Sequence, residues 1–224
     1  MLEWTLFKDA EAVAKAASER IQQAADKAIR QHGFFRLVLA GGGTPKLAYQ
    51  LLASSDSQWQ RWHLYFGDER CLPADHPDRN SEMVHHSLSG QVPIPSAQVH
   101  PIPTELGAEA AAGDYRQLLQ AALPFQMVLL GLGEDGHTAS LFPGQQHPGD
   151  ALVLPVHNAP KPPPDRVSLS AGALADTENL LFLVTGGGKR DAVRRWRANE
   201  PIPANTIATE GRAEVLIDQA AWPE

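Results

Sequence analysis

The sequence predicts an α/β fold with a mostly parallel, Rossmann-like sheet between two layers of helices. Apolar runs of strand length alternate with helical segments along the chain, which is the pattern of a parallel sheet covered on both faces. The strands are nearly all apolar, as expected when neither face meets water. There is no internal repeat and no linker, so residues 1–224 are predicted to form a single domain.

The N-terminal elements carry clear start and stop signals. Asp9 can cap a helix that runs to about His32 and is closed by Gly33. The apolar positions that share one face of this helix are Val13, Ala17, Ile21, Ala24 and Ala28. A strand over 34–40 leads into the glycine loop 41–43, and Pro45 suits the first position of a helix that runs to about residue 53.

The middle and the C-terminal part repeat this alternation. Further strands are expected over 62–66, 125–130, 151–156, 166–169, 180–185 and 215–218, and helices over 80–88, with Asn80 as cap, and over 105–123, 170–176 and 190–199. The charged segment 67–70 and the proline-bearing segments 71–80 and 91–104 are predicted to be loops. Lys161 and three consecutive prolines indicate a stiff surface loop over 160–165.

Composition excludes several classes of protein. The formal net charge of −7 gives no electrostatic support for nucleic-acid binding. No stretch of about 20 apolar residues could span a membrane, and residues 1–10 do not have the pattern of a signal peptide. The single cysteine, Cys71, excludes an internal disulfide framework and fits a reducing compartment. We therefore expect a soluble cytoplasmic protein.

The segment 129–144, Leu-Leu-Gly-Leu-Gly-Glu-Asp-Gly-His-Thr-Ala-Ser-Leu-Phe-Pro-Gly, is predicted to form an active-site loop. It follows a buried strand, and its glycines permit a sharp turn and a close approach to a ligand. Asp135 and His137 lie in this loop, where a carboxylate can orient and tune an imidazole. The glycines also match the dinucleotide fingerprint, but Pro143 and Gly144 stop any long helix and no acidic residue follows at the required distance, so nicotinamide binding is disfavoured.

Loops that follow parallel strands emerge on the same edge of the sheet, where ligands bind. This edge should bring together residues from four loops, namely Gly42, Gly43, Thr44, Asp68, Arg70, His137 and Lys189. Glycine loops with arginine and lysine can hold a phosphate, while the acidic residues and His137 act elsewhere on the same molecule. Each feature also has a structural alternative, since Arg70 can pair with Glu69 or Asp75 and the glycines can serve as turns.

The chain resembles 6-phosphogluconolactonases along nearly its whole length. The resemblance rests on the segments 39–45 (Leu-Ala-Gly-Gly-Gly-Thr-Pro), 67–70 (Gly-Asp-Glu-Arg), 79–81 (Arg-Asn-Ser), 131–144, 166–170 (Arg-Val-Ser-Leu-Ser) and 185–189 (Thr-Gly-Gly-Gly-Lys). It implies the fold of glucosamine-6-phosphate deaminases and hydrolysis of 6-phospho-D-glucono-1,5-lactone in the pentose phosphate pathway, without a required cofactor. No residue is assigned as a metal ligand. The expected partner is this small sugar-phosphate lactone. The oligomeric state stays open between a monomer and a small homo-oligomer.

For the mechanism we expect His137, held by Asp135 or Asp68, to activate water. Arg70 and Lys189 are expected to hold the phosphate with the first glycine loop, and Arg79 is a further candidate for that contact. Ala40 and Gly43 stand where family members often carry serines, which affects phosphate affinity more than the reaction.

Two alternatives to a lactonase are open. A deaminase-like isomerase would need a carboxylate where Phe142 stands. A non-catalytic sugar-phosphate sensor would not need the pair of Asp135 and His137.

Overall fold

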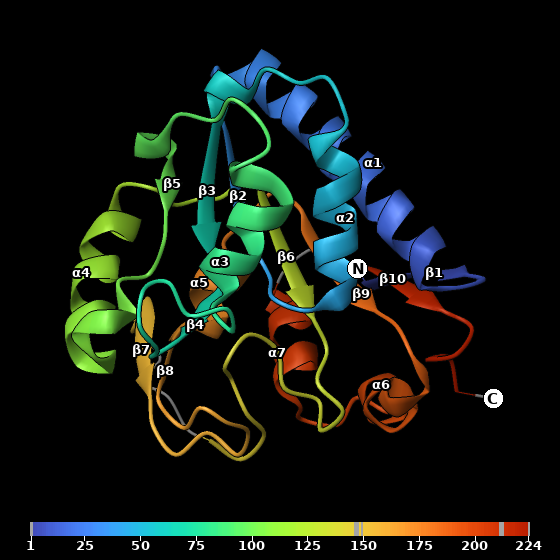
Figure 1. Cartoon of the computed structure of the whole chain (residues 1–224). Coiled ribbons are helices and arrows are strands. Elements are labelled where there is room, and N and C mark those ends of the chain that lie inside the picture. The colour runs from blue at the N-terminus through green and yellow to red at the C-terminus, as the bar shows by residue number, and fades with distance from the viewer. Residues whose placement is uncertain (1, 146–147, 149, 211–212, 224) are drawn as a thin grey trace.

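The computed structural model describes residues 2–145, 148, 150–210 and 213–223, and its largest element is a parallel sheet. The sheet has seven strands in the order β1-β10-β9-β6-β2-β3-β5 (Figure 1). These strands are β1 (Leu2–Phe7), β2 (Phe35–Leu39), β3 (Trp62–Phe66), β5 (Val99–His100), β6 (Met127–Gly131), β9 (Leu180–Val184) and β10 (Ala213–Asp218). All neighbouring pairs are parallel, so the predicted fold class is confirmed.

Helices cover both faces of this sheet. The helices are α1 (Ala10–His32), α2 (Gly43–Ala53), α3 (Asn80–Val84), α4 (Ala108–Gln120), α5 (Ala171–Ala175), α6 (Arg190–Arg197) and α7 (Pro203–Glu210). The connections through α1 and α2 cross the sheet in one direction, and those through α5 and through α6 and α7 cross it in the other. Because such connections are right-handed, the two groups lie on opposite faces; α1 packs on α2, and α5 packs on α7.

The capping residues of α1 act as the sequence predicts. The side chain of Asp9 accepts a hydrogen bond of 2.9 Å from the backbone N–H of Ala12. Gly33 ends the helix with φ of 82°, a left-handed conformation that favours glycine. On the predicted apolar face only Ala24 stays half-exposed, and the other four positions are buried.

A second, smaller sheet is a difference from the prediction. Strands β4 (Asp68–Arg70), β8 (Arg166–Leu169) and β7 (Val153–Val156) pair antiparallel in the order β4-β8-β7, and α4 packs on β7 and β8. The sequence predicts a charged loop over 67–70, after the strand that ends at residue 66, so this prediction is wrong for 68–70. Here the carboxylate of Glu69 is fully buried and accepts bonds from the backbone N–H groups of Arg70, Asn80 and Ser81, so its polar atoms are satisfied.

Several element boundaries also differ from expectation. Helix α2 begins at Gly43 rather than Pro45, and Asn80 is the first residue of α3 rather than its cap. A π-helical turn, η2 (His85–Ser89), extends α3. Strands β1 and β5 and helix α7 were not predicted: β1 is a partly exposed edge strand without a long apolar run, and β5 has two residues inside a proline-rich segment.

The order of the strands reverses between β2 and β6. From β2 the chain moves outward to β3 and β5, and from β6 it moves the other way to β9 and β10. In open parallel sheets a ligand binds beyond the carboxyl ends of the strands at such a reversal. The loops after β2 and β6 are the two predicted glycine loops. Among the described residues, no helix is long and apolar enough to cross a membrane.

Candidate active site

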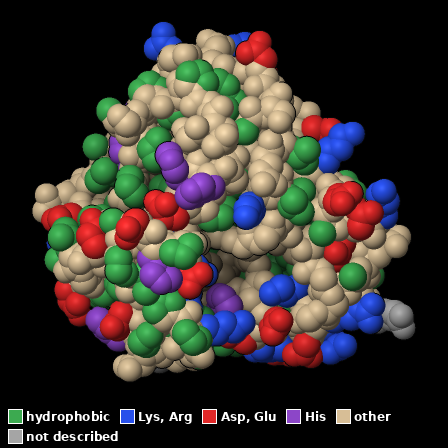
Figure 2. All heavy atoms as spheres, viewed as in Figure 1, with side chains coloured by type: hydrophobic (Ala, Val, Ile, Leu, Met, Phe, Trp, Pro, Cys, Tyr) green, Lys and Arg blue, Asp and Glu red, His purple; other side chains and the backbone are tan. Residues whose placement is uncertain are grey.

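A cavity of about 310 Å³ opens at the point where the strand order reverses. Its lining comes from the loops after β2, β3, β6 and β9, and from the segment before β8. Figure 2 shows a hollow on this face with histidine and cationic side chains at its rim. The predicted residues Gly42, Asp68, Arg70, His137 and Lys189 all line this cavity.

The loop after β6 is folded tightly around His137. The backbone N–H of Gly133 donates to the carbonyl of His137 over 2.7 Å, and Gly136 has φ of 89°. A methyl group at Gly133 would lie 2.0 Å from Nδ1 of His137 and 2.7 Å from Oδ1 of Asp135. Only glycine therefore leaves room for this imidazole and this carboxylate.

Asp135 is the carboxylate that contacts His137. Its Oδ1 lies 2.5 Å from Nδ1 of His137 and also accepts the backbone N–H of His137 over 3.1 Å. When Nδ1 carries the proton, Nε2 has a free lone pair, as a general base requires. Burial lowers the pKa of His137 and outweighs the opposing effect of Asp135, so the imidazole is neutral near pH 7. Burial alone would raise the pKa of Asp135, but the hydrogen bonds from His137 outweigh it and keep that pKa low.

Asp68, the other predicted carboxylate, lies on the opposite wall and makes no hydrogen bond with His137. One of its oxygens accepts from the side-chain amide of Asn80 over 3.1 Å, and the other accepts from the hydroxyl of Ser140 over 2.5 Å. All three side chains are buried. Asp68 is therefore held rigidly at the cavity wall, where its charge still acts on His137 through space.

The first glycine loop lies beside both Asn80 and the loop after β9. Gly41 and Gly42 line the cavity, whereas Gly43 and Thr44 form the first turn of α2 just outside it. The hydroxyl of Thr44 lies 2.6 Å from that of Thr185, which ties this helix start to the loop that carries Lys189. The N–H groups of a first helical turn have no partner within the helix and favour an anion.

Of the three cations predicted to bind phosphate, the structure places two at the cavity and one elsewhere. Arg70 and Lys189 line it, and among the described residues Nε of Arg70 is buried with no hydrogen-bond partner. Arg79 does not line the cavity: its guanidinium contacts the carboxylates of Glu69 (3.6 Å) and Glu105 (2.8 Å) and the carbonyl of Ile102 (2.7 Å). The assignment of Arg79 to phosphate is therefore corrected to a structural role.

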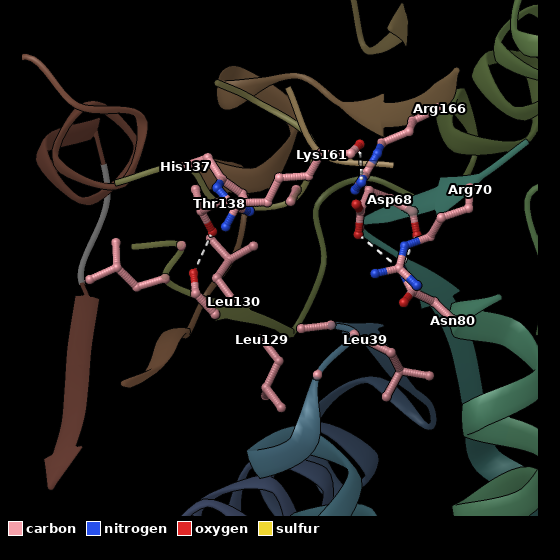
Figure 3. A pocket seen from close by; sticks show the side chains of 18 of the residues that line it. Leu39, Asp68, Arg70, Asn80, Leu129, Leu130, His137, Thr138, Lys161 and Arg166 are labelled. Atoms are coloured by element: carbon pink, nitrogen blue, oxygen red, sulfur yellow. Dashed lines mark hydrogen bonds between the residues drawn. The ribbon is translucent and has the colours of Figure 1, made fainter. Parts of the chain in front are cut away.

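The structure adds two cations that the sequence reasoning did not assign to the site. Lys161 and Arg166 both line the cavity, as Figure 3 shows. Lys161 lies in an exposed loop and Arg166 begins a strand, as the sequence predicts, but neither position by itself indicates a contact with the cavity. The arginine in the 166–170 motif was the available signal, but nothing local indicated that β8 would pair with β4 beside Asp68.

Four cations thus line the cavity of a chain whose net charge is −7. Burial lowers the pKa of Lys189, the nearby charge of Lys161 adds to this effect, and Glu134 opposes it. Such an arrangement favours an anionic ligand. Among the described residues, no group of three or more His, Cys, Asp or Glu side chains could hold a metal ion.

Comparison with known proteins agrees with this geometry. The family model of glucosamine-6-phosphate isomerases/6-phosphogluconolactonase matches residues 8–217. A 6-phosphogluconolactonase of Mycobacterium tuberculosis is 36% identical over 228 residues, which cover 94% of this chain and 92% of that protein. One from Synechocystis is 35% identical over 210 residues, which cover 87% of this chain and 86% of that protein.

Solved structures give the same result. The crystal structure of a 6-phosphogluconolactonase from Thermotoga maritima has a TM-score of 0.89 at 30% identity, and the match covers 97% of this chain and 99% of that one. A monomeric glucosamine-6-phosphate deaminase shares the fold, with a TM-score of 0.85 at 20% identity over 98% of each chain. The chain belongs to the glucosamine-6-phosphate isomerase/6-phosphogluconolactonase family.

Proposed function

We propose that this protein hydrolyses 6-phospho-D-glucono-1,5-lactone to 6-phosphogluconate in the oxidative pentose phosphate pathway. The observation that carries the proposal is the pair of His137 and Asp135 at one end of a cavity lined by four cations. A lactone is an activated ester that needs a base for water, and its phosphate needs positive charge. Relatives named 6-phosphogluconolactonase that cover most of the chain support the same reaction.

His137 acts as the general base. Neutral His137 takes a proton from water at Nε2 while the water oxygen bonds to C1 of the lactone, and the carbonyl electrons move onto oxygen. The tetrahedral intermediate then expels the ring oxygen, which receives the proton from His137. Asp135 holds the imidazole through Nδ1 and stabilises the imidazolium, and Asp68 adds negative charge from the opposite wall. A positioned base typically contributes about 100- to 10,000-fold.

The phosphate binds away from His137. Arg70 and Lys189 supply fixed positive charge, and the glycine loop with Gly42, Gly43 and Thr44 supplies backbone donors at the start of α2. Backbone donors thus take the place of the serine hydroxyls that the family often has in this loop, because Thr44 lies just outside the cavity with its hydroxyl next to that of Thr185. Binding energy from this remote group can be used to orient C1 for attack.

A deaminase reaction has less support. Phe142 stands where that reaction needs a carboxylate; it is buried, and its ring centroid lies 4.8 Å from that of His137. The similarity to the monomeric deaminase concerns the fold alone at 20% identity. Both sheets contribute residues to the cavity, so the chain acts as a single catalytic domain. Its single cysteine fits a reducing compartment such as the cytoplasm.

Hydrolysis of freshly prepared 6-phosphogluconolactone tests the function. The product is followed through NADP reduction by added 6-phosphogluconate dehydrogenase, and the spontaneous rate is subtracted. The wild-type protein should accelerate hydrolysis strongly, and His137→Ala should lower kcat by about 100-fold or more with little change in KM. Absence of acceleration by the wild-type protein would refute the function, and a normal rate for His137→Ala would refute only the role of the base.

A further inference from the structure

The segment 157–166, here called the strap, brings a lysine to the cavity from outside the parallel sheet. It connects β7 to β8 and contains four prolines, at positions 160, 162, 163 and 164. Lys161 and Pro162 line the cavity, and Figure 3 shows the side chain of Lys161 extending toward His137. The strap therefore reaches the end of the cavity that holds the base.

Arg166 holds the backbone of the strap in place. Its Nη2 donates to the carbonyls of Lys161 and Pro162 over 2.9 and 3.0 Å, and its Nε donates to the carbonyl of Pro163 over 3.1 Å. Arg166 is buried, and its positive charge strengthens these bonds. Three consecutive carbonyls next to Lys161 are thus held by one guanidinium.

The outer side of the strap has its own contacts. The ring nitrogens of His157 lie 2.8 Å from a carboxylate oxygen of Asp165 and 2.7 Å from one of Glu109 on α4. The N–H of Ala159 donates to the carbonyl of Pro164, and the N–H of Cys71 donates to that of Asp165. With proline restricting φ at four positions, the backbone at Lys161 is in place before a ligand binds.

The ammonium group of Lys161 has no such contact. Among the described residues it makes no hydrogen bond and no ion pair. The backbone around it is held, by Arg166 at the carbonyl of Lys161 and by the pair of His157 and Asp165 near the two ends of the strap. The other charged groups that act on His137 are carboxylates, Asp135 from its own loop and Asp68 from β4. Lys161 is therefore the cation among the charged groups that act on His137, and its ammonium is free to bind a ligand.

We propose that Lys161 stabilises the negative charge that develops on the carbonyl oxygen of the lactone, with Arg166 as the residue that positions it. The inference rests on the proposed function and adds a group for the oxyanion. When the hydroxyl from water bonds to C1, the carbonyl oxygen becomes anionic, and it loses this charge when the bond from C1 to the ring oxygen breaks. Lys161 is exposed, but the backbone that carries it is held before a ligand binds, so bringing its charge to that oxygen needs less reorganisation than ordering water there.

The test uses Lys161→Met, which keeps most of the side-chain volume, Lys161→Arg, which keeps the charge, and Lys15→Met, which removes a charge from an exposed position on α1. Lys161→Met should lower kcat by about 10- to 100-fold with a smaller change in KM, as on loss of one oxyanion contact. Lys161→Arg should recover most of this loss, and Lys15→Met should match the wild type.

The pH profile separates an electrostatic role from a structural one. The positive charge of Lys161 lowers the pKa of His137, so Lys161→Met should move the acid limb of kcat/KM to higher pH, whereas a merely structural change would leave it in place. Binding of glucose 6-phosphate, which has the phosphate but no lactone carbonyl, should be the same in Lys161→Met and wild type.

Three results would overturn the proposal. They are an unchanged kcat in Lys161→Met, an unshifted acid limb, and weaker binding of glucose 6-phosphate, which would assign Lys161 to the phosphate instead. Each is measured against an active wild-type protein, so none of them can be confused with failure of the proposed function.

Discussion

The cavity is built from two regions of different construction, the carboxyl edge of the parallel sheet and the small antiparallel sheet with its strap. The parallel sheet contributes His137, Asp135, Lys189 and the first glycine loop, each directly after a buried strand. The small sheet contributes Asp68, Arg70, Arg166 and Lys161 through strands that pair over almost 100 residues of sequence. The parallel sheet therefore holds the proposed base, and the small sheet with its strap supplies Asp68 and three of the four cations.

The two regions also keep their side chains in place by different means. In the loop after β6 a glycine at position 133 leaves the space that the imidazole occupies. At the small sheet, the carboxylate of Glu69 accepts backbone N–H groups and pairs with Arg79, and the guanidinium of Arg166 donates to carbonyls of the strap. Mutations in the first region should thus act on the geometry of the proposed base, and mutations in the second should act on stability or on the charges that assist the reaction.

The largest effect is expected from Gly133→Ala in the parallel-sheet region. Because the new methyl group would lie 2.0 Å from Nδ1 of His137, the imidazole must move away from Asp135. We expect a fall in kcat of about 100-fold or more, close to that of removing the base. The measurement is the coupled lactone assay together with a thermal melt.

The matched control is Gly113→Ala on α4, where a methyl group would meet no atom within 4 Å. This change should leave kcat unaltered and stabilise the helix by about 0.5–1 kcal/mol. A wild-type kcat in Gly133→Ala would show that the loop tolerates a side chain and that His137 is not held as described.

The next effect is on stability, from Arg79→Met beside the small sheet. This variant leaves the carboxylate of Glu69, fully buried, without its cation. Breaking such a pair should cost about 3–5 kcal/mol of unfolding free energy, measured by urea denaturation, with KM for the lactone unchanged in the folded fraction. Arg116→Met, at an exposed position of α4, should stay within about 0.5 kcal/mol. A raised KM without loss of stability would return Arg79 to the phosphate site.

The smallest effect is a shift in the pH at which activity is lost on the acid side. The shift should have opposite directions for Asp135→Asn in the parallel-sheet region and Lys161→Met in the strap. His137 works as a base only when neutral, so activity is lost as the pH falls through its pKa. Since burial lowers that pKa below the ordinary value of 6.5, the acid limb of kcat/KM in the wild type should lie below pH 6.5. Asp135→Asn removes the charge that favours imidazolium, so its limb should move to still lower pH, opposite to Lys161→Met. If the acid limb moved in the same direction in both variants, Asp135 and Lys161 could not both act on the pKa of His137 as described.

Much of the parallel sheet could be predicted from local signals. Apolar strands, the cap at Asp9, the glycine at position 33 and the loops after 39 and 131 depend on neighbours within a few residues. The edge strand β1 and the two-residue strand β5 were missed, because neither has an apolar run of its own. Parallel topology then places the strand ends at one edge, which explains why His137, Gly42 and Lys189 meet without any regular spacing.

The sequence by itself determined the fold class and placed Asp135 and His137, the proposed base, in one loop, since these follow from strand periodicity and from one short segment. Only the tertiary structure decided that Asp135 rather than Asp68 contacts His137, that Arg79 supports Glu69, and that Lys161 reaches the cavity. These outcomes depend on the pairing of residues 68–70 with 166–168. No local pattern specifies that pairing, because its stability comes from burial and hydrogen bonds between segments that are distant along the chain.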